Sequence, residues 1–298
     1  MYKQTNSKIL SLYAISPIHA GAGTSLGVVD LPVQRERHTR WPHIQASGVK
    51  GSMRHHFEKF KGILEPKMGD QLEQITELIF GSENFMDGVT LPGAVSVSDA
   101  KLLAFPMRSS YSPFVSITCP AVLKRLLNDF RLTGKFEEMS IPNVGEDQAI
   151  IVHGDISPGK KILLEDYEVE TVSGENIELP GTAQKMFEKA QTLLLVGDGT
   201  FSYGVENCME IRTQIKIDDK KGTTVPGSLR YEELLPSDSL MYVILFYGAT
   251  RNEGAPVQAE QLISYMKDEV IKSHIQIGGN ETLGCGLFQV DWINGGAQ

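Results

Sequence analysis

The sequence predicts an α+β fold in which helices cover one face of an antiparallel sheet. The chain opens with a strand-loop-helix pattern over 9–60 and closes with a strand-helix-strand pattern over 240–292. Between these ends, no tandem repeat and no long linker rich in Ser, Pro or Gly divides the 298 residues. We therefore expect one domain, 1–298, that carries insertions.

The apolar pattern predicts the elements of the first half in order. Apolar residues recur about every four positions in the first predicted helix, from Val49 through Met53 and Phe57 to Phe60. The expected elements are a strand at 9–16 that Pro17 ends, a helix at 48–60 that Ser47 caps, a helix at 71–80 that Gly81 ends, strands at 94–98 and 101–105, and a helix at 122–132 that starts with Pro120.

The second half contains a hairpin signal and the closing unit. Residues 211–217 alternate in polarity and then turn at 218–222, which predicts a protruding hairpin within 211–235. The other expected elements are a strand at 161–171, a helix at 182–195, a buried strand at 240–247, a helix at 258–273, and strands at 275–277 and 287–292.

Composition places the chain among ordinary folded proteins. Hydrophobic residues make up 41% of it and charged residues 22%. No apolar run approaches the ~20 residues that a membrane-spanning helix needs, and the first residues lack an apolar signal core. The three cysteines are far apart with no CxxC pair, which argues against disulfides and a zinc site. We expect a cytoplasmic protein with no membrane partner.

Charge is divided unevenly along the chain. The net charge is −9, yet residues 1–60 hold eight Lys and Arg against three acidic residues, a local charge of +5. Five of the seven histidines lie in the same segment. A basic face on an acidic protein is typical of a surface that binds a polyanion. The net acidity still argues against coating of nucleic acid over the whole surface.

Two cations share one side of the first predicted helix. Lys50 and Arg54 are four residues apart, so they lie on one face, where like charges repel each other. A phosphate backbone would offset that repulsion. The basic residues just upstream, Arg35, Arg37 and His38, favour this interpretation over a solvated face.

Two glycine-rich segments are predicted loops that can approach a ligand closely. The first is 21–27, GAGTSLG. The second is 278–286, with four glycines in nine residues: Gly278, Gly279, Gly284 and Gly286. A simple hairpin turn seldom needs so many glycines. If the two loops pack together, they form a seat for a ribose-phosphate chain.

Asp30 follows the first glycine-rich loop in an apolar setting. A carboxylate there could orient or deprotonate a ribose 2′-hydroxyl, or hold a divalent cation. The alternative is that Asp30 pairs with Arg35 or Arg37, or caps a turn. The residues alone leave both interpretations open.

Three further side chains are candidates for chemistry. His19 and His38 could exchange protons near neutral pH. Glu232, beside Glu233, could contribute a metal ligand. A lone histidine is more often structural, and paired acids more often cap an element or stay solvated, so these alternatives also stay open.

Four segments together resemble one known family. They are IHAGAGTSLGVVDLPVQRERHT near the start, SGVKGSMR in the first helix, the hairpin region ending in LRYEELLP, and IGGNETLGCGLF near the end. The chain resembles the RAMP superfamily of CRISPR-associated proteins, and within it the backbone subunits of type III-B (Cmr) effector complexes. The run DLPVQRERHT is the most specific part of this resemblance.

The resemblance implies a modified ferredoxin-like (RRM-like) core with an antiparallel sheet, helical insertions and a β-hairpin thumb at 211–235. It implies copies of the chain in a filament along a guide CRISPR RNA, together with other Cmr complex subunits. It also implies that these copies cleave the paired target RNA at regular intervals with a divalent metal ion of the Mg²⁺ or Mn²⁺ type.

The same resemblance implies roles for single residues. Asp30 matches the catalytic and metal-binding aspartate of the family, and His19 and Glu232 have weaker claims to catalysis. The implied RNA-binding residues are Arg35, Arg37, His38, Lys50, Arg54, Gly278, Gly279, Gly284 and Gly286. The run of aromatic residues that is typical of RRM strands is missing, so we expect contacts mainly with the RNA backbone.

Two other functions fit the same residues. The chain could be an RNA-binding scaffold without chemistry, in which Asp30 only braces the arginine-rich loop. It could also be a metal-independent endoribonuclease that processes the guide, with His19 or His38 in acid–base pairs.

Overall fold

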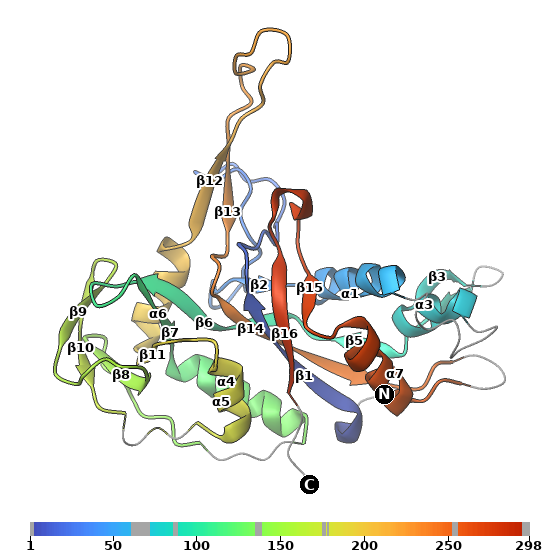
Figure 1. Cartoon of the computed structure of the whole chain (residues 1–298), viewed down its shortest axis with the longest axis horizontal. Coiled ribbons are helices and arrows are strands. Elements are labelled where there is room, and N and C mark those ends of the chain that lie inside the picture. Colours follow the sequence, from blue (N-terminus) through green and yellow to red (C-terminus); the bar gives the residue numbers. More distant parts are fainter. Residues whose placement is uncertain are drawn as a thin grey trace.

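The computed structural model describes residues 3–60, 72–85, 89–134, 139–174, 177, 179–251 and 256–293. The body of the molecule is built around one large β-sheet, and a long β-hairpin projects from this body (Figure 1). Among the described residues, no helix has the length and apolar character needed to cross a membrane.

The strands are spread over the whole described chain. They are β1 (Ser7–Ala14), β2 (His43–Ile44), β3 (Ser82–Phe85), β4 (Val89–Leu91), β5 (Val95–Val97), β6 (Ala100–Arg108), β7 (Phe114–Thr118), β8 (Gln148–His153), β9 (Lys161–Leu164), β10 (Tyr167–Val172), β11 (Leu193–Val196), β12 (Glu210–Gln214), β13 (Arg230–Leu234), β14 (Leu240–Tyr247), β15 (His274–Gln276) and β16 (Leu287–Ile293).

The helices alternate with these strands. They are α1 (Ala46–Phe60), α3 (Leu72–Phe80), α4 (Pro120–Leu132), α5 (Gly181–Phe187), α6 (Asp198–Asn207) and α7 (Ala259–Ser264), which a π-helical turn extends (Tyr265–Val270). Short 3₁₀ turns lie at Gln4–Asn6 and Glu281–Leu283.

The centre of the sheet has the predicted ferredoxin-like arrangement. Four strands lie in the order β16-β1-β14-β6, and each neighbouring pair is antiparallel. The chain passes from β1 through α1 to β6, and later from β14 through α7 to β16. Two strand-helix-strand connections in an antiparallel sheet define this class of fold.

The insertions extend the sheet beyond β6. The order continues through β7, β11, β8, β10 and β9. The pairs β11 with β7 and β10 with β8 are parallel. The predicted antiparallel pairing therefore holds for the core but not for the whole insertion.

The central strand β14 is confirmed with the bounds that the sequence predicts. All eight of its residues are buried, because β1 and β6 border its edges and α7 packs against it. A continuous apolar run is typical of a strand that is covered on both faces. This strand holds the core on which the loops of the site are mounted.

The predicted strand at 161–171 is wrong, because the segment forms two strands. β9 and β10 pair antiparallel around a tight turn in which Leu164 faces Tyr167. Glu165 in this turn has a φ of 49°, a left-handed conformation that lets the chain reverse within two residues. Apolar residues continue on both sides of the turn and conceal it in the sequence.

The predicted helix at 182–195 is wrong over its second half. Helix α5 ends at Phe187, and Leu193–Val196 forms the fully buried strand β11. Four consecutive apolar residues fit a buried strand as well as a buried helix. Pairing with β7 and β8 on either side decides for the strand.

Several helix ends differ from the prediction. Helix α1 starts at Ala46, so Ser47 lies inside it rather than at its cap, and the Ala46 N–H donates to Asp99 Oδ1 at 2.7 Å. This capping side chain is 53 residues away along the chain, out of reach of a local pattern. The last predicted helix ends at Val270 rather than at 273. Of the predicted helix 71–80, residue 71 lies outside the described residues, and α3 confirms the rest.

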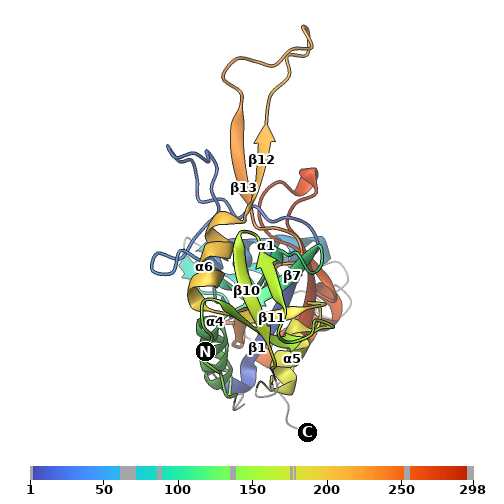
Figure 2. The ribbon, with the colours of Figure 1, turned by 90° about the vertical axis from the view of Figure 1, so that its left-hand side faces the viewer.

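The predicted hairpin is present, with outer limits at 210 and 234 rather than 211 and 235, and its first strand ends at Gln214 rather than at 217. β12 and β13 pair antiparallel from Glu210 opposite Leu234 to Gln214 opposite Arg230. Near its tip the chain turns at Gly222, whose φ of 66° suits glycine. We name 210–234 the thumb, and Figures 1 and 2 show that it stands well clear of the body.

Candidate functional site

The loop between β1 and β2 is fastened to the base of the thumb. The Leu31 N–H donates to Tyr231 O at 3.1 Å, and the Glu233 N–H donates to Leu31 O at 3.0 Å. The loop segment at Leu31 therefore runs parallel to β13 like a short extra strand. This pairing brings the first candidate residues of the sequence next to Glu232 and Glu233, 200 residues further along.

Asp30 lies at this junction and is half-buried. Its Oδ2 accepts the Tyr231 N–H at 2.7 Å, whereas its Oδ1 makes no hydrogen bond to the described part of the chain. Asp30 forms an ion pair with neither Arg35 nor Arg37 within that part, so the pairing considered as an alternative does not occur. The other alternative was that Asp30 caps a turn. Its carboxylate does accept a backbone N–H, but that N–H belongs to Tyr231 at the base of the thumb.

A hollow of about 500 Å³ opens beside Asp30. Its walls include Val29 and Pro32, which flank Asp30, together with Arg40 and Glu206. Asp30 itself is not among the lining residues, so the hollow adjoins the segment that carries Asp30 and has charged residues of both signs on its wall.

Arg35 and Glu233, which also line this hollow, form a mostly buried ion pair. Arg35 Nη2 donates to Glu233 Oε1 at 2.6 Å, and the two side chains are only 11% and 10% exposed. Arg35 Nη1 also donates to the carbonyl oxygens of Arg40 and Val205. Glu233 Oε2 accepts the Val33 N–H. These contacts make Arg35 a brace between the loop and the thumb.

His19 and Glu232 meet on the other side of β13. The His19 Nδ1 atom lies 2.9 Å from Glu233 O, and its Nε2 atom lies 3.4 Å from Glu232 Oε1. Because a backbone carbonyl can only accept, Nδ1 carries the proton. Glu232 is buried and also accepts from Gln214 Nε2 and Asn280 Nδ2. Through these contacts, His19 and Glu232 hold the base of the thumb together.

The second glycine-rich loop packs against the root of the first. The Gly279 N–H donates to His19 O at 2.8 Å, and the Gly286 N–H donates to Pro17 O at 2.9 Å. Gly278 has a φ of 103°, and a Cβ there would lie 2.8 Å from His19 O, closer than real contacts allow. The second loop therefore contacts residues 17–19, just ahead of the run 21–27, and Gly278 makes this approach possible.

Arg37, His38 and Arg40 form an exposed cationic turn at the outer end of the loop. We name these three residues the basic turn. The side chain of His38 is 75% exposed and lies 3.8 Å from Glu36. The basic turn therefore presents its cations to solvent, where they can meet a phosphate backbone.

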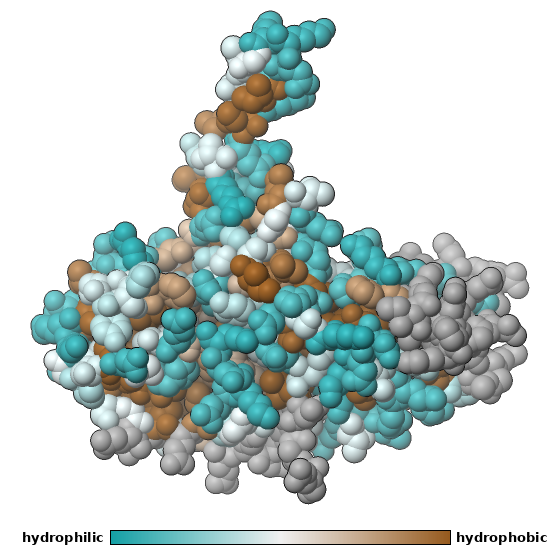
Figure 3. Space-filling view, in the orientation of Figure 1, coloured by the Kyte–Doolittle hydropathy of each residue, from teal (hydrophilic) through white to brown (hydrophobic). Residues whose placement is uncertain are grey.

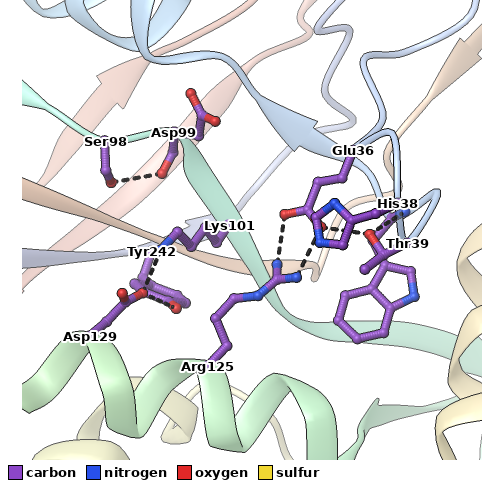
Figure 4. A network of polar contacts seen from close by, with 10 residues as sticks. Glu36, His38, Thr39, Ser98, Asp99, Lys101, Arg125, Asp129 and Tyr242 are labelled. Carbon is purple, nitrogen blue, oxygen red and sulfur yellow. Dashed lines mark hydrogen bonds and ion pairs between the residues drawn. The ribbon is translucent and has the colours of Figure 1, made fainter.

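Glu36 fastens the basic turn to the body. Arg125 of α4 donates to its two carboxylate oxygens at 2.7 and 2.9 Å (Figure 4). Thr39 Oγ1 donates to the same carboxylate at 2.5 Å. Burial alone raises the pKa of Glu36, but the hydrogen bonds of Thr39 and Arg125 and the charge of Arg125 outweigh it and lower the pKa below 4.5. Glu36 is therefore ionised at neutral pH.

Lys50 and Arg54 lie together on α1, at a second open hollow of about 620 Å³. Arg54 Nη1 donates to Gly81 O at 3.1 Å, and the opposite wall includes Pro92 and Gly93. Burial and the neighbouring charge of Arg54 lower the pKa of Lys50. A phosphate in this hollow would relieve the repulsion between the two cations.

The described residues do not make a metal site of their own. No group of three or more His, Cys, Asp or Glu side chains in the described ranges lies close enough to hold a metal ion. Asp30 offers one oxygen, and both oxygens of Glu232 already accept hydrogen bonds. One carboxylate oxygen is too few ligands for a closed Mg²⁺ or Mn²⁺ site.

Sequence reasoning missed the residues that hold the site in place. Arg125 and Glu233 lie 89 and 198 residues from their partners Glu36 and Arg35. One signal was present for Glu36, a single acid within an otherwise basic run. For Arg125, in an ordinary amphipathic helix, the sequence carried no such signal.

Comparison with known proteins gives one family over most of the chain. The model of the RAMP superfamily matches residues 11–289. The CRISPR system Cmr endoribonuclease Cmr4 of Pyrococcus furiosus is 31% identical over 292 residues, which cover 95% of this chain and 94% of that protein.

Solved structures agree with this similarity. The crystal structure of oligomeric Cmr4 from Pyrococcus furiosus aligns with a TM-score of 0.68 at 26% identity, over 96% of this chain and 97% of the other. A cryo-EM structure of the type III-B Cmr-beta complex bound to cognate target RNA aligns with a TM-score of 0.70 at 23% identity, again over 96% and 97%. At 23% identity, the similarity to this second structure supports the fold alone.

Proposed function

Because the chain belongs to the RAMP superfamily, we propose that it is the backbone subunit of a type III-B (Cmr) CRISPR effector complex. As one domain over 1–298, in the cytoplasm, it binds a guide CRISPR RNA beside further copies of itself and other Cmr subunits. It cleaves the target RNA that pairs with the guide, at regular intervals. The full-length similarity to a protein named an endoribonuclease supports this function.

One observation carries the catalytic part of the proposal. Asp30 is held at the thumb base by the backbone of Tyr231, keeps one carboxylate oxygen without a hydrogen bond to the described residues, and has Val29 and Pro32 of its own segment in the wall of an open hollow. The basic turn follows on the same loop, and its Arg40 lines the same hollow. A carboxylate next to a surface that can seat phosphates is the arrangement that RNA cleavage by a 2′-hydroxyl needs.

The proposed reaction is in-line attack of a ribose 2′-oxygen on the adjacent phosphorus. Asp30 orients the 2′-hydroxyl and accepts its proton as the O2′–P bond forms. The P–O5′ bond breaks, and the leaving 5′-oxygen takes a proton from solvent. The products are a 2′,3′-cyclic phosphate and a 5′-hydroxyl end. Nearby cations offset the charge that develops on the phosphate.

His19 and Glu232 support this reaction by position. Their contacts with the thumb base and the second glycine-rich loop fix the segment that leads to Asp30. The proposal gives them positioning roles, since Glu232 has both oxygens engaged in hydrogen bonds.

A requirement for a divalent metal ion of the Mg²⁺ or Mn²⁺ type is a separate part of the proposal. Since no group of three metal-ligating side chains comes together among the described residues, RNA phosphates and water would have to supply most ligands beside Asp30, as is common for Mg²⁺. EDTA tests this part without changing the chain.

The test is cleavage by the guide-loaded complex of two targets that differ only in the 2′-oxygen at the cleaved positions. The first is an all-ribose target, and the second carries a 2′-deoxy nucleotide just 5′ of each cleaved phosphate. We expect cleavage of the first into cyclic-phosphate ends and none of the second. Equal cleavage of both would exclude attack by the 2′-oxygen.

A second candidate function has one observation in its favour. The hydrogen bond from Tyr231 to Asp30 also fits a scaffold in which this carboxylate only braces the thumb. In that case the complex binds target RNA but does not cut it. A matched guide and target that stay intact with Mg²⁺ present would favour the scaffold.

A further inference from the structure

We propose that Arg40 is a further catalytic residue, whose guanidinium group binds the phosphate that is cleaved and offsets the negative charge that builds up on it. Asp30 acts on the 2′-hydroxyl, and Arg40 acts on the phosphate that this hydroxyl attacks. The inference rests on the proposed function, and it assigns to one cation of the basic turn a role in the reaction itself.

Arg40 lines the hollow that adjoins the segment of Asp30. The wall of this hollow, which has a volume of about 500 Å³, includes Val29 and Pro32 on either side of Asp30 and Arg40 from further along the same loop. A space of this size is typical of sites for small ligands, so it can hold a ribose with its phosphate. A phosphate in the hollow would lie between the segment of Asp30 and the guanidinium group.

Arg40 has a positive charge that the described part of the chain does not offset. Arg35 also lines the hollow, but its Nη2 donates to Glu233 Oε1 at 2.6 Å and its Nη1 donates to two backbone carbonyl oxygens. The side chain of Arg40 is exposed and forms neither an ion pair nor a hydrogen bond with the residues that the structure describes. Glu206 lies on the same wall, yet it forms no ion pair with Arg40. A phosphate would supply the missing partner.

The thumb adds no positive charge to the described wall of the hollow. Its contribution there is an acid, Glu233. Apolar side chains occupy much of the thumb above its base (Figure 3), and Ile215 and Ile217 are about half exposed. Arg230 lies next to Tyr231 at the base, but its Nε donates to Gln214 Oε1 at 2.9 Å and it does not line the hollow. The cation that meets a phosphate in the hollow therefore comes from the loop.

The backbone at Arg40 has a conformation that arginine rarely adopts. Its φ of 64° lies in the left-handed region, which favours glycine. The turn holds this conformation, because the Arg40 N–H donates to Glu36 O at 3.0 Å and Arg35 Nη1 donates to Arg40 O at 2.8 Å. A long side chain at a position that suits glycine costs stability, and such positions are concentrated at functional sites.

The segments on both sides of Arg40 are fixed to the body. Trp41 is buried, and its Nε1 donates to Ser202 Oγ at 3.1 Å. On the other side, Arg125 holds both carboxylate oxygens of Glu36 (Figure 4). The guanidinium group is therefore carried by a rigid turn, as a group that stabilises a transition state by its charge requires.

The role of Arg40 follows from the charge that develops during attack. As the O2′–P bond forms and before the P–O5′ bond breaks, the nonbridging oxygens of the phosphate gain negative charge. A guanidinium group keeps its protons in proteins, so Arg40 donates hydrogen bonds to these oxygens and transfers no proton. Asp30 still takes the 2′-proton, and solvent still supplies the 5′-proton. The hydrogen bonds of Arg40 strengthen in the transition state and raise the rate of cleavage more than the affinity for the target.

The first test is single-turnover cleavage with guide-loaded complex in excess over target RNA. Arg40→Gly is the variant of choice, because glycine suits the left-handed backbone and the variant should unfold at the same temperature as wild type or higher. We expect its rate at saturation to fall about 100- to 1,000-fold, with little change in target affinity. Arg40→Lys should keep part of the rate, since an ammonium group carries the charge without the planar fork. Lys124→Gln, at an exposed lysine on α4, is the matched control and should cleave like wild type.

The second test is chemical rescue. Guanidinium chloride in the millimolar range, compared with an equal concentration of sodium chloride, should restore part of the cleavage by the Arg40→Gly complex. It should not restore cleavage by the Asp30→Asn complex, because that variant lacks a carboxylate rather than a cation.

Three results would overturn the inference. Cleavage at the wild-type rate by a fully assembled Arg40→Gly complex would show that no guanidinium group acts on the phosphate there. Weaker target binding with an unchanged rate at saturation would make Arg40 a residue that only binds RNA. A slow Arg40→Gly complex that neither added guanidinium nor Arg40→Lys improves would assign the loss to the shape of the turn.

These outcomes separate the role of Arg40 from the proposed function. If the wild-type complex cleaves no target, the proposed function fails. If wild type cleaves, Asp30→Asn does not and Arg40→Gly cleaves like wild type, the inference about Arg40 alone fails.

Discussion

Asp30 accepts a hydrogen bond from the backbone of Tyr231 at 2.7 Å, which joins the candidate catalytic carboxylate to the base of the thumb. The two residues are 201 positions apart in the sequence. Because the bond uses a backbone N–H, it fixes the carboxylate without consuming another side chain. Movement of the thumb would therefore move Asp30 with it.

Arg35 and Arg37 lie two positions apart, yet we expect them to behave differently. Arg35→Gln leaves the buried Glu233 carboxylate without its cation, and the free energy of unfolding should fall by roughly 3 kcal/mol. Arg37→Gln should change stability by less than about 0.5 kcal/mol but weaken RNA binding. Urea unfolding and an RNA titration on each variant give the comparison. Equal stability of the two variants would contradict the brace assigned to Arg35.

Gly278 and Gly279 form a second contrasting pair. Gly278→Ala places a methyl group 2.8 Å from His19 O at a φ of 103°, and we expect a loss of roughly 1–3 kcal/mol in unfolding free energy. At Gly279 the nearest atom to a new Cβ lies at 3.5 Å, so Gly279→Ala should be tolerated. Thermal unfolding of both variants tests this. If Gly278→Ala is as stable as Gly279→Ala, the close packing of the loops is wrong.

Glu36 should make stability depend on acid pH. Its folded pKa lies below the ordinary 4.5, so the ionised form stabilises the fold above that pH, and this contribution disappears as pH falls through the folded pKa. We expect Arg125→Met to raise the pKa of Glu36 and to reduce the loss of stability between about pH 6 and about pH 3, by on the order of 1 kcal/mol.

The measurement is urea unfolding across that pH range for wild type and Arg125→Met. Glu36→Gln is the control, because it removes the titrating group and keeps the shape of the side chain. Identical pH profiles for all three proteins would show that the ion pair does not act on stability.

Lys50 and Arg54 should bind RNA through its backbone. Lys50→Gln and Arg54→Gln should each lower the salt dependence of binding by about 1 in the log–log slope. The loss should be similar for guides of unrelated sequence. Lys124→Gln, at an exposed lysine on α4, should leave the slope unchanged. A loss that varies strongly with base sequence would contradict backbone recognition.

The sequence predicted the parts of the fold that local patterns determine. Strand β14 and helix α4 follow from a continuous apolar run and from Pro120 at a helix start. The turn at Glu165 and strand β11 were missed because both lie within apolar runs, where the period does not separate strand from helix. Pairing with β7 and β8 makes Leu193–Val196 a strand rather than part of a helix.

The candidate site divides in a similar way. Asp30 and the glycine-rich loops could be picked out because their residue types are unusual for their settings. Their supports could not, since Glu233 and Arg125 bind across 198 and 89 residues. Arg35 belonged to the same basic run as Arg37, and only the fold distinguishes a buried brace from an exposed cation.

The most direct test of the central claim is single-turnover cleavage by guide-loaded complexes that contain wild type, Asp30→Asn or the matched surface control Asp219→Asn. An asparagine can still accept the Tyr231 N–H, so assembly and target binding should persist in every complex. We predict that Asp30→Asn slows cleavage roughly 100-fold or more, while Asp219→Asn cleaves like wild type. Cleavage at the wild-type rate by a fully assembled Asp30→Asn complex would contradict the account.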